Sequence, residues 1–321
     1  MTILRKKECR SKSCLMNEYI QKRMEYKRVM GKNSTADLYQ ATGHHLLAFR
    51  NGKDFPVREL TPTMVSDFQD YLQAKGLKIN SVNSYMSCLR AIYNAAFNEK
   101  PFPVKIYPFR NLKLKRDITV KKPLSESMIK KLAMANFSDP TLVLATDLAL
   151  FSFMAYGMPF ADMVRLTQKN IRQGWLIYNR HKTGIQIRIE ITPGMRRILD
   201  KWRMDSEYLF PIMFPNASHS QYKALLANYN RSLVKIGEKL GIHEHLTSYV
   251  FRYTWAAEAR RLHVDISVIS QAMGHTSEKT TRGYLNQLDQ SELDSANRTI
   301  TKSINTLLVR KSKRWGRHVW E

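Results

Sequence analysis

The apolar positions of the first hundred residues recur at helical spacing. After Thr61-Pro62, a pair suited to a helix N-cap and first helical position, Val65, Phe68 and Leu72 form one apolar stripe that Gly76 brings to an end. A second helix is expected from about Ser81, with an apolar face of Val82, Tyr85, Leu89 and Ile92. The pattern predicts a small helical bundle whose outer surface is polar and basic.

The pattern changes between residues 102 and 122. Pro101, Pro103 and Pro108 prevent a continuous helix, and the Lys113-Leu114-Lys115-Arg116 cluster would repel itself if packed. We interpret this stretch as a basic linker. Ser125 follows it as a candidate helix cap, with Leu124 placed to pack on Ile129.

The region after the linker mixes helical and strand patterns. Asp139-Pro140 opens an apolar helix expected to run to Gly157, and a short helix follows at about 161–166. Residues 175–179 and 185–192 predict a β-hairpin, because apolar and polar residues alternate in its second strand. Further helices are expected at about 195–205, 220–240, 248–262 and 266–273, and a short one is expected to end near Tyr284.

These elements predict a mainly α protein with a small β-hairpin or sheet, the second domain being α+β. The expected division is a basic N-terminal tail at 1–16, a helical domain at 17–101, the linker at 102–122, an α+β domain at 123–290, and a C-terminal helix with a basic tail at 291–321. The last helix carries a stripe of Leu293, Ala296, Ile300, Ile304 and Leu307.

Composition excludes several classes of protein. The 321 residues suit two domains, and 43% apolar residues exclude a disordered basic tail. No apolar run approaches the roughly 18–20 residues of a membrane span, and the N-terminus lacks the apolar stretch of a signal peptide, so we expect a cytoplasmic protein without a membrane partner. Cys9, Cys14 and Cys88 have neither disulfide nor zinc-site spacing, so no metal is expected.

The formal charge of +25 is unevenly distributed. Residues 1–32, 101–122 and 310–320 hold 22 basic and 4 acidic residues, a balance of +18 within 65 positions. Such segregation indicates basic arms and a connector that face a polyanion, most plausibly nucleic acid. The alternative is a set of solvated tails that keep the protein soluble. If the arms hold DNA, affinity should fall steeply as salt is added.

The C-terminal third concentrates the motifs that carry chemistry. They are Lys182-Thr183-Gly184 in a hairpin turn, Arg252-Tyr253-Thr254-Trp255-Ala256 in a helix, Gly274-His275, and Thr280-Thr281-Arg282-Gly283-Tyr284. In their order and spacing these motifs resemble the tyrosine recombinases, also called the phage integrase family. The helical first domain and basic linker look like that family's core-binding domain and connector, so the likeness extends over nearly the whole chain.

The resemblance implies a site-specific DNA recombinase, of integrase or invertase type, that needs neither metal nor ATP nor any other cofactor. Tyr284 would attack a DNA phosphate to give a 3′-phosphotyrosyl link, and Arg252 would bind the phosphate oxygens. His275 would hydrogen-bond the phosphate or assist proton movement, and Lys182 would protonate the leaving 5′-oxygen.

The chain departs from the family pattern at two positions. Pro159 stands where the family has its first catalytic arginine, and proline has no side-chain donor. Tyr249 stands at a histidine position, where its hydroxyl still suits a hydrogen bond to phosphate. Arg165 and Arg172 are the candidates for a compensating cation. We predict a slow but active enzyme.

Double-stranded DNA is the expected partner. The predicted DNA-binding residues of the first domain and linker are Asn83, Ser84, Arg90, Lys113, Lys115 and Arg116. A homo-oligomer on DNA, a tetramer in the synapse, is expected to form through the C-terminal helix, with accessory DNA-bending proteins as further partners.

Three other functions stay open at this point. The first is a catalytically impaired recombinase homologue with an architectural or regulatory role, which Pro159 and Tyr249 support. The second is a relaxing topoisomerase with the same tyrosine chemistry. The third is a metal-dependent transposase, which is disfavoured because the few carboxylates show no shared cluster.

Overall fold

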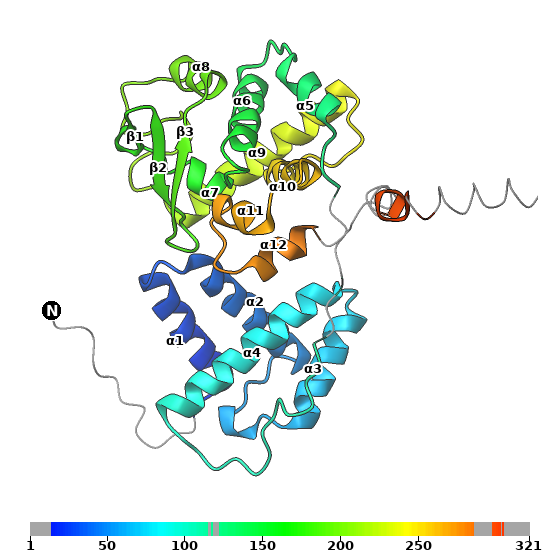
Figure 1. Cartoon of the computed structure of the whole chain (residues 1–321). Coiled ribbons are helices and arrows are strands. Elements are labelled where there is room, and N and C mark those ends of the chain that lie inside the picture. The colour runs from blue at the N-terminus through cyan, green and yellow to red at the C-terminus, as the bar shows by residue number, and fades with distance from the viewer. Residues whose placement is uncertain (1–13, 115–116, 118–121, 286–296, 303, 305–321) are drawn as a thin grey trace, which may run out of the picture. The chain divides into compact units, whose positions relative to one another are not determined.

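The computed structural model describes residues 14–114, 117, 122–285, 297–302 and 304, without the side chains of 283–285. The chain divides into two compact units, residues 1–119 and 120–321. Figure 1 shows a first unit built of helices and a second unit in which a small sheet lies at one side of the helices. The expected fold class, mainly α with a small sheet, is confirmed.

The first unit is a bundle of four α-helices with one 3₁₀ turn. The elements are α1 (Met16–Val29), α2 (Asn33–Phe49), η1 (Val57–Glu59), α3 (Pro62–Ala74) and α4 (Ile79–Glu99). Helix α4 packs against the other three helices, and its predicted stripe is buried at Val82, Leu89 and Ile92. Thr61 caps α3 by accepting a hydrogen bond from the Met64 N–H, with Pro62 in the first turn, as the sequence predicts.

The described residues of the second unit combine helices with a three-stranded antiparallel sheet. Its elements are α5 (Glu126–Ala133), α6 (Pro140–Met154), α7 (Phe160–Met163), η2 (Gln168–Asn170), β1 (Ile171–Arg172), β2 (Trp175–Asn179), β3 (Gln186–Glu190), α8 (Pro193–Lys201), α9 (His219–Leu240), α10 (Val250–Arg261), α11 (Ile266–Ala272) and α12 (Glu278–Leu285). The strand order is β1-β2-β3. Helix α6 packs against α8, α9 and α10, which places an apolar helix in the middle of this unit.

The sheet corrects one expectation. The sequence predicted a two-stranded hairpin, but β1 adds a third strand that pairs antiparallel with β2. Gln173 and Gly174 join the two strands and both have positive φ, 48° and 82°, as a tight two-residue hairpin turn requires. A strand of two residues is too short to show alternation, so the pattern did not reveal it.

Helix α6 ends at Met154, three residues before the expected Gly157. The chain turns there through Tyr156 (φ 59°) and Gly157 (φ 67°), both in the left-handed region. Pro159 follows this turn and is the N-cap residue of α7. The end of α6 at Met154 therefore determines where the segment with Pro159 begins.

Parts of the predicted tails lie outside the described residues. These include Cys9 and, of the C-terminal stripe, Leu293, Ala296 and Leu307; Ile300 and Ile304 are described and are exposed. Of the two described cysteines, Cys14 is exposed and Cys88 is buried, and neither is in a disulfide. None of the described helices has the length and apolarity to span a bilayer.

Candidate active site

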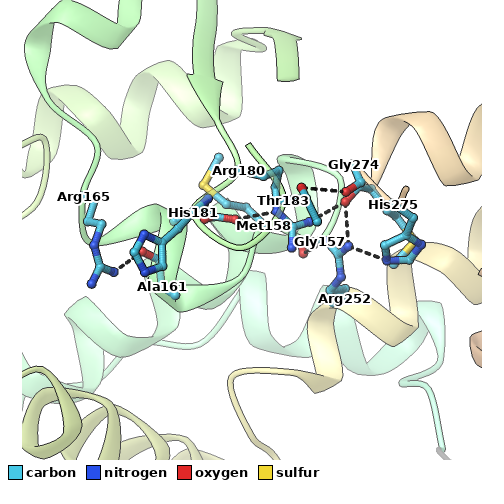
Figure 2. Close-up of polar contacts among 12 residues, drawn as sticks. Gly157, Met158, Ala161, Arg165, Arg180, His181, Thr183, Arg252, Gly274 and His275 are labelled. Atoms are coloured by element: carbon cyan, nitrogen blue, oxygen red, sulfur yellow. Dashed lines mark hydrogen bonds and ion pairs between the residues drawn. The ribbon is translucent and has the colours of Figure 1, made fainter. Parts of the chain in front are cut away.

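Arg252 is the most buried cation of the candidate site. It is the third residue of α10, and its side chain is 2% exposed. Its Nη1 donates to the Gly157 carbonyl at 3.0 Å, and its Nη2 donates to the Met273 carbonyl at 2.7 Å and lies 2.9 Å from His275 Nε2 (Figure 2). The guanidinium is therefore fixed by the chain segments that follow α6 and α11.

Gly157 makes room for the helix that carries Arg252. A Cβ at this position would lie 2.5 Å from the Arg252 Cα and 3.0 Å from its Cβ, well inside van der Waals contact. The positive φ of 67° is also strained for any residue with a side chain. Close approach and left-handed backbone together require glycine here.

Gly157→Ala should therefore destabilise the protein, by about 2–4 kcal/mol in the free energy of unfolding. The matched control is Gly241→Ala, because Gly241 also has positive φ (59°) but no atom lies within 4 Å of its added Cβ. Only the backbone strain of about 1 kcal/mol applies there. Urea denaturation of both variants measures the difference, and equal losses would contradict the packing argument.

His275 is held between Arg252 and α12. Gly274, with φ of 63°, follows the end of α11 and directly precedes His275. The His275 Nε2 faces Arg252, and its Nδ1 lies 2.7 Å from the Thr281 hydroxyl. Because a guanidinium can only donate, Nε2 is the acceptor, and the ring proton of the neutral imidazole is on Nδ1, where it donates to Thr281.

The surroundings of His275 also keep it neutral. Burial lowers its pKa to about 4, and the positive charges of Arg252, Arg180 and Lys182 act in the same direction. The sequence left its charge open. In this structure it is a neutral group with an acceptor lone pair aimed at Arg252, not a third phosphate-binding cation.

This pKa predicts a pH dependence of stability. Between the ordinary pKa of about 6.5 and the folded value of about 4, the unfolded chain binds a proton at His275 that the folded chain does not. The contribution of His275 to stability is thus present above pH 6.5 and lost as pH falls toward 4, by about 1–2 kcal/mol after allowance for solvent screening. Urea denaturation at several pH values should show a shallower acid loss for His275→Gln than for the wild type; equal slopes would contradict the assignment.

Lys182 lies on an anchored turn between β2 and β3. The His181 N–H donates to Asp162 Oδ1 at 2.8 Å, and the Thr183 hydroxyl donates to the Gly274 carbonyl at 3.2 Å. Gly184, with φ of 73°, closes the turn by donating to the Arg180 carbonyl. The base of the turn is fixed while Lys182 itself is exposed, an arrangement suited to reaching a bound substrate.

A cavity of about 140 Å³ adjoins this turn. Its walls include Pro159, Arg180, Lys182, Tyr222 and Tyr249. Tyr249 is the N-cap residue of α10 and is 37% exposed, with its ring centroid 5.6 Å from that of Tyr253. Two of the predicted site residues, Tyr249 and Lys182, therefore line one cavity. Pro159, which stands where the family has its first catalytic arginine, lines the same cavity.

Tyr284 belongs to α12, although its side chain lies outside what the structure describes. Helix α12 packs against α10 and α11, the helices that bring Arg252 and His275 to the site. Thr281, one turn before Tyr284, is fully buried and contacts His275. The helix carrying the expected nucleophile is thereby anchored at the candidate site.

The two candidates for a compensating cation lie elsewhere. Arg172 is exposed on β1, where its Nε donates to the Lys169 carbonyl. Arg165 donates to the Ala161 carbonyl at 2.5 Å (Figure 2). Its guanidinium lies 5.0 Å from the ring centroid of Tyr222, and Arg165 is not among the residues that line the cavity.

Sequence reasoning missed a buried ion pair at the centre of this network. Arg180 Nε lies 2.8 Å from Asp162 Oδ2, with side-chain exposures of 6% and 2%. Arg180 Nη1 also donates to the Met273 carbonyl, the same oxygen that Arg252 contacts. One signal was available: Arg180 directly follows a predicted strand and stands two residues before Lys182.

Of the predicted DNA-binding residues, four fall in the described part of the first unit. Asn83, Ser84 and Arg90 lie on α4; Ser84 is exposed and the other two are half-buried. Lys113 is exposed in the segment after α4, while Lys115 and Arg116 lie outside the described residues. Within the described ranges, no three His, Cys, Asp or Glu side chains gather at a site for a metal ion.

Comparison with known proteins adds family matches to this geometry. Residues 15–115 match the model of the phage integrase SAM-like domain, and residues 124–291 match that of the phage integrase family. The tyrosine recombinase XerA of Pyrococcus furiosus is 26% identical over 220 residues, which cover 66% of this chain and 72% of that protein.

Solved structures share the fold. The Tn1549 transposon integrase in complex with transposon right end DNA aligns with a TM-score of 0.64 at 15% identity, over 91% of this chain and all of that one. A lambda integrase dimer bound to a COC′ core site aligns with a TM-score of 0.60 at 17% identity, over 85% of this chain and 77% of that one.

Proposed function

This chain belongs to the phage integrase family, and from that membership we propose how its residues divide the work of a tyrosine recombinase. It is a site-specific recombinase, an enzyme that cleaves and rejoins DNA through a phosphotyrosine intermediate. The observation that carries the assignment of roles is the convergence of Arg252, His275 and α12 on one network beside the Lys182 turn.

In the proposed cleavage step, the Tyr284 phenol oxygen attacks the scissile phosphorus, and the phenol proton passes to His275. The bond to the 5′-oxygen breaks, and a 3′-phosphotyrosyl ester and a free 5′-hydroxyl result. Lys182 gives the leaving 5′-oxygen its proton, and Arg252 neutralises the charge that builds on the non-bridging oxygens. Rejoining is the same step in reverse, with a 5′-hydroxyl as nucleophile.

His275 and Tyr249 have supporting roles in this proposal. A neutral His275 with its lone pair on Nε2 cannot donate to phosphate from that nitrogen, so of its two expected roles the geometry favours assistance to proton movement. The phosphate charge would raise its pKa from about 4 and make it a better proton acceptor when DNA is bound. Tyr249 donates its hydroxyl hydrogen to a phosphate oxygen at the cavity mouth.

The substrate is double-stranded DNA, which we propose is held by phosphate contacts from α4 and the basic linker. Asn83, Ser84, Arg90 and Lys113, with Lys115 and Arg116, would position the duplex without reading its sequence. Lambda integrase is a dimer on its core site and a tetramer on a Holliday junction. We propose that this chain likewise assembles into a tetramer in the synapse. A transposon integrase among the structural relatives makes a mobile element the expected genetic context.

A nicked suicide duplex tests this function. Duplexes built from the DNA that flanks the gene, each nicked near a candidate cleavage position, lose the short 5′-hydroxyl fragment after cleavage and trap the covalent enzyme. We expect an SDS-stable adduct that forms in EDTA without ATP and leaves a 5′-hydroxyl end. Failure to trap an adduct on any of these duplexes, with DNA binding intact, would instead support the impaired homologue. Supercoil relaxation without recombinant products would favour a topoisomerase.

A further inference from the structure

The missing first arginine leaves the proposed site with one phosphate-binding guanidinium where the family pattern has two. Pro159 is buried at the N-terminus of α7, with φ of −65°, and has no side-chain donor. The loss of one such donor costs on the order of 10²–10³ in rate. A recombinase that retains the rest of the site needs a replacement.

Arg180 stands next to the gap. It lines the same cavity as Pro159, Lys182 and Tyr249. Arg180 comes from the end of β2, so its approach to the site differs from that of a residue on the α6–α7 connection. The spacing of the family's motifs along the sequence would therefore not identify Arg180 as a site residue.

The guanidinium groups of Arg180 and Arg252 share one hydrogen-bond acceptor. Arg180 Nη1 and Arg252 Nη2 both donate to the Met273 carbonyl oxygen (Figure 2). Two like charges at this separation repel unless carboxylates or an anion offset them. Asp162 offsets one, and Lys182 adds a third positive charge on the adjoining turn, so the cluster has the excess charge of an anion-binding site.

The buried pair also orients Arg180 for this use. Asp162 binds the Nε side of the guanidinium and, through its other oxygen, holds the His181 N–H at the base of the turn. Among the contacts of the described residues, those of Arg180 use Nε and Nη1, which leaves Nη2 for a phosphate oxygen. A planar guanidinium fixed on one edge and open on the other suits phosphate binding.

We propose that Arg180 is the second phosphate-binding arginine of the site and takes over the work of the arginine that Pro159 replaces. The inference rests on the recombinase function proposed above. Asp162 is then a positioning residue, which presents Arg180 and the Lys182 turn together. Arg180 touches the same non-bridging oxygens as Arg252 and stabilises the charge that builds on them during attack.

The test measures single-turnover cleavage of the suicide duplex by the full-length chain. Because removal of Arg180 alone leaves Asp162 buried without its partner, Asp162→Asn is compared with the double variant Asp162→Asn, Arg180→Met, in which the pair is removed together. We expect the double variant to cleave at least tenfold more slowly than Asp162→Asn and about 10²–10³-fold more slowly than the wild type. Rates equal within threefold would overturn the proposal.

Two further measurements separate phosphate binding from a structural role. Adding Pro159→Arg to the double variant should restore cleavage at least tenfold, because position 159 lines the same cavity as Arg180 and is where the family pattern has its first arginine. A methylphosphonate at the scissile position removes the phosphate charge, so on this substrate the double variant should differ from Asp162→Asn by clearly less than it does on the natural phosphate. A purely structural Arg180 would give no rescue and the same loss on both substrates, and either result would overturn the proposal.

The control variants use other cations of the second unit. Arg188→Ala, on the exposed face of β3, removes the same charge and should leave cleavage unchanged. Arg165→Ala tests the competing cation, and a larger loss there than at Arg180 would overturn the proposal. If the wild type itself forms no adduct, the recombinase function fails; if it cleaves and Arg180 makes no difference, only the present inference fails.

Discussion

Tyr284→Phe should abolish the covalent adduct and reduce strand cleavage by a factor on the order of 10⁴ or more. The substitution removes one oxygen atom and leaves the ring, so α12 and its contact between Thr281 and His275 are retained. DNA binding should change by less than about twofold, because phosphate contacts elsewhere supply the affinity. Adduct trapping on the suicide duplex and fluorescence anisotropy with intact duplex measure the two effects.

Tyr253 provides the control for this experiment. It follows Arg252 directly on α10, but burial and then the neighbouring Tyr249 raise its pKa to about 12, which makes it a poor nucleophile. Tyr253→Phe should therefore form the adduct at close to the wild-type rate. An adduct with Tyr284→Phe, or its loss with Tyr253→Phe alone, would move the nucleophile away from α12.

Local signals in the sequence located most of the elements. Thr61-Pro62 and Ser125 begin helices by the capping contacts their residue types suggest, because a cap depends on atoms within three residues. The end of α6 was misplaced because it depends on a distant contact. Gly157 has to approach α10 closely, and nothing in the sequence near 157 records that approach.

The candidate site divides in the same way. The order of Lys182, Arg252, His275 and Tyr284 was accessible from the sequence through its family resemblance, and their roles remain proposals. The Asp162–Arg180 pair was not accessible, because its partners are 18 residues apart on a helix and a strand end whose packing no periodicity describes. The charge of His275 was also hidden, since it follows from burial and from cations contributed by two other segments.

Substitution of Arg252 is expected to have the second large effect, because this residue contributes both to DNA cleavage and to the stability of the fold. Its guanidinium contacts the Gly157 and Met273 carbonyls and His275, so Arg252→Ala loses buried hydrogen bonds as well as the phosphate ligand. We expect cleavage to fall by about 10²–10³-fold or more. The free energy of unfolding should fall by about 3–5 kcal/mol, since the carbonyls lose a charged donor in a buried setting.

Arg252→Lys separates the two effects. A lysine ammonium retains the charge but is a compact group, and it cannot serve the Gly157 and Met273 carbonyls and a phosphate fork at the same time. We expect this variant to recover much of the stability in urea denaturation while its cleavage rate stays at least about 10²-fold below the wild type. Arg261→Ala, which removes an exposed arginine of the same helix paired with Glu258, should leave both the stability and the cleavage rate close to those of the wild type. If Arg252→Lys cleaves as fast as the wild type, charge alone suffices at this position and the shape of the guanidinium is not required.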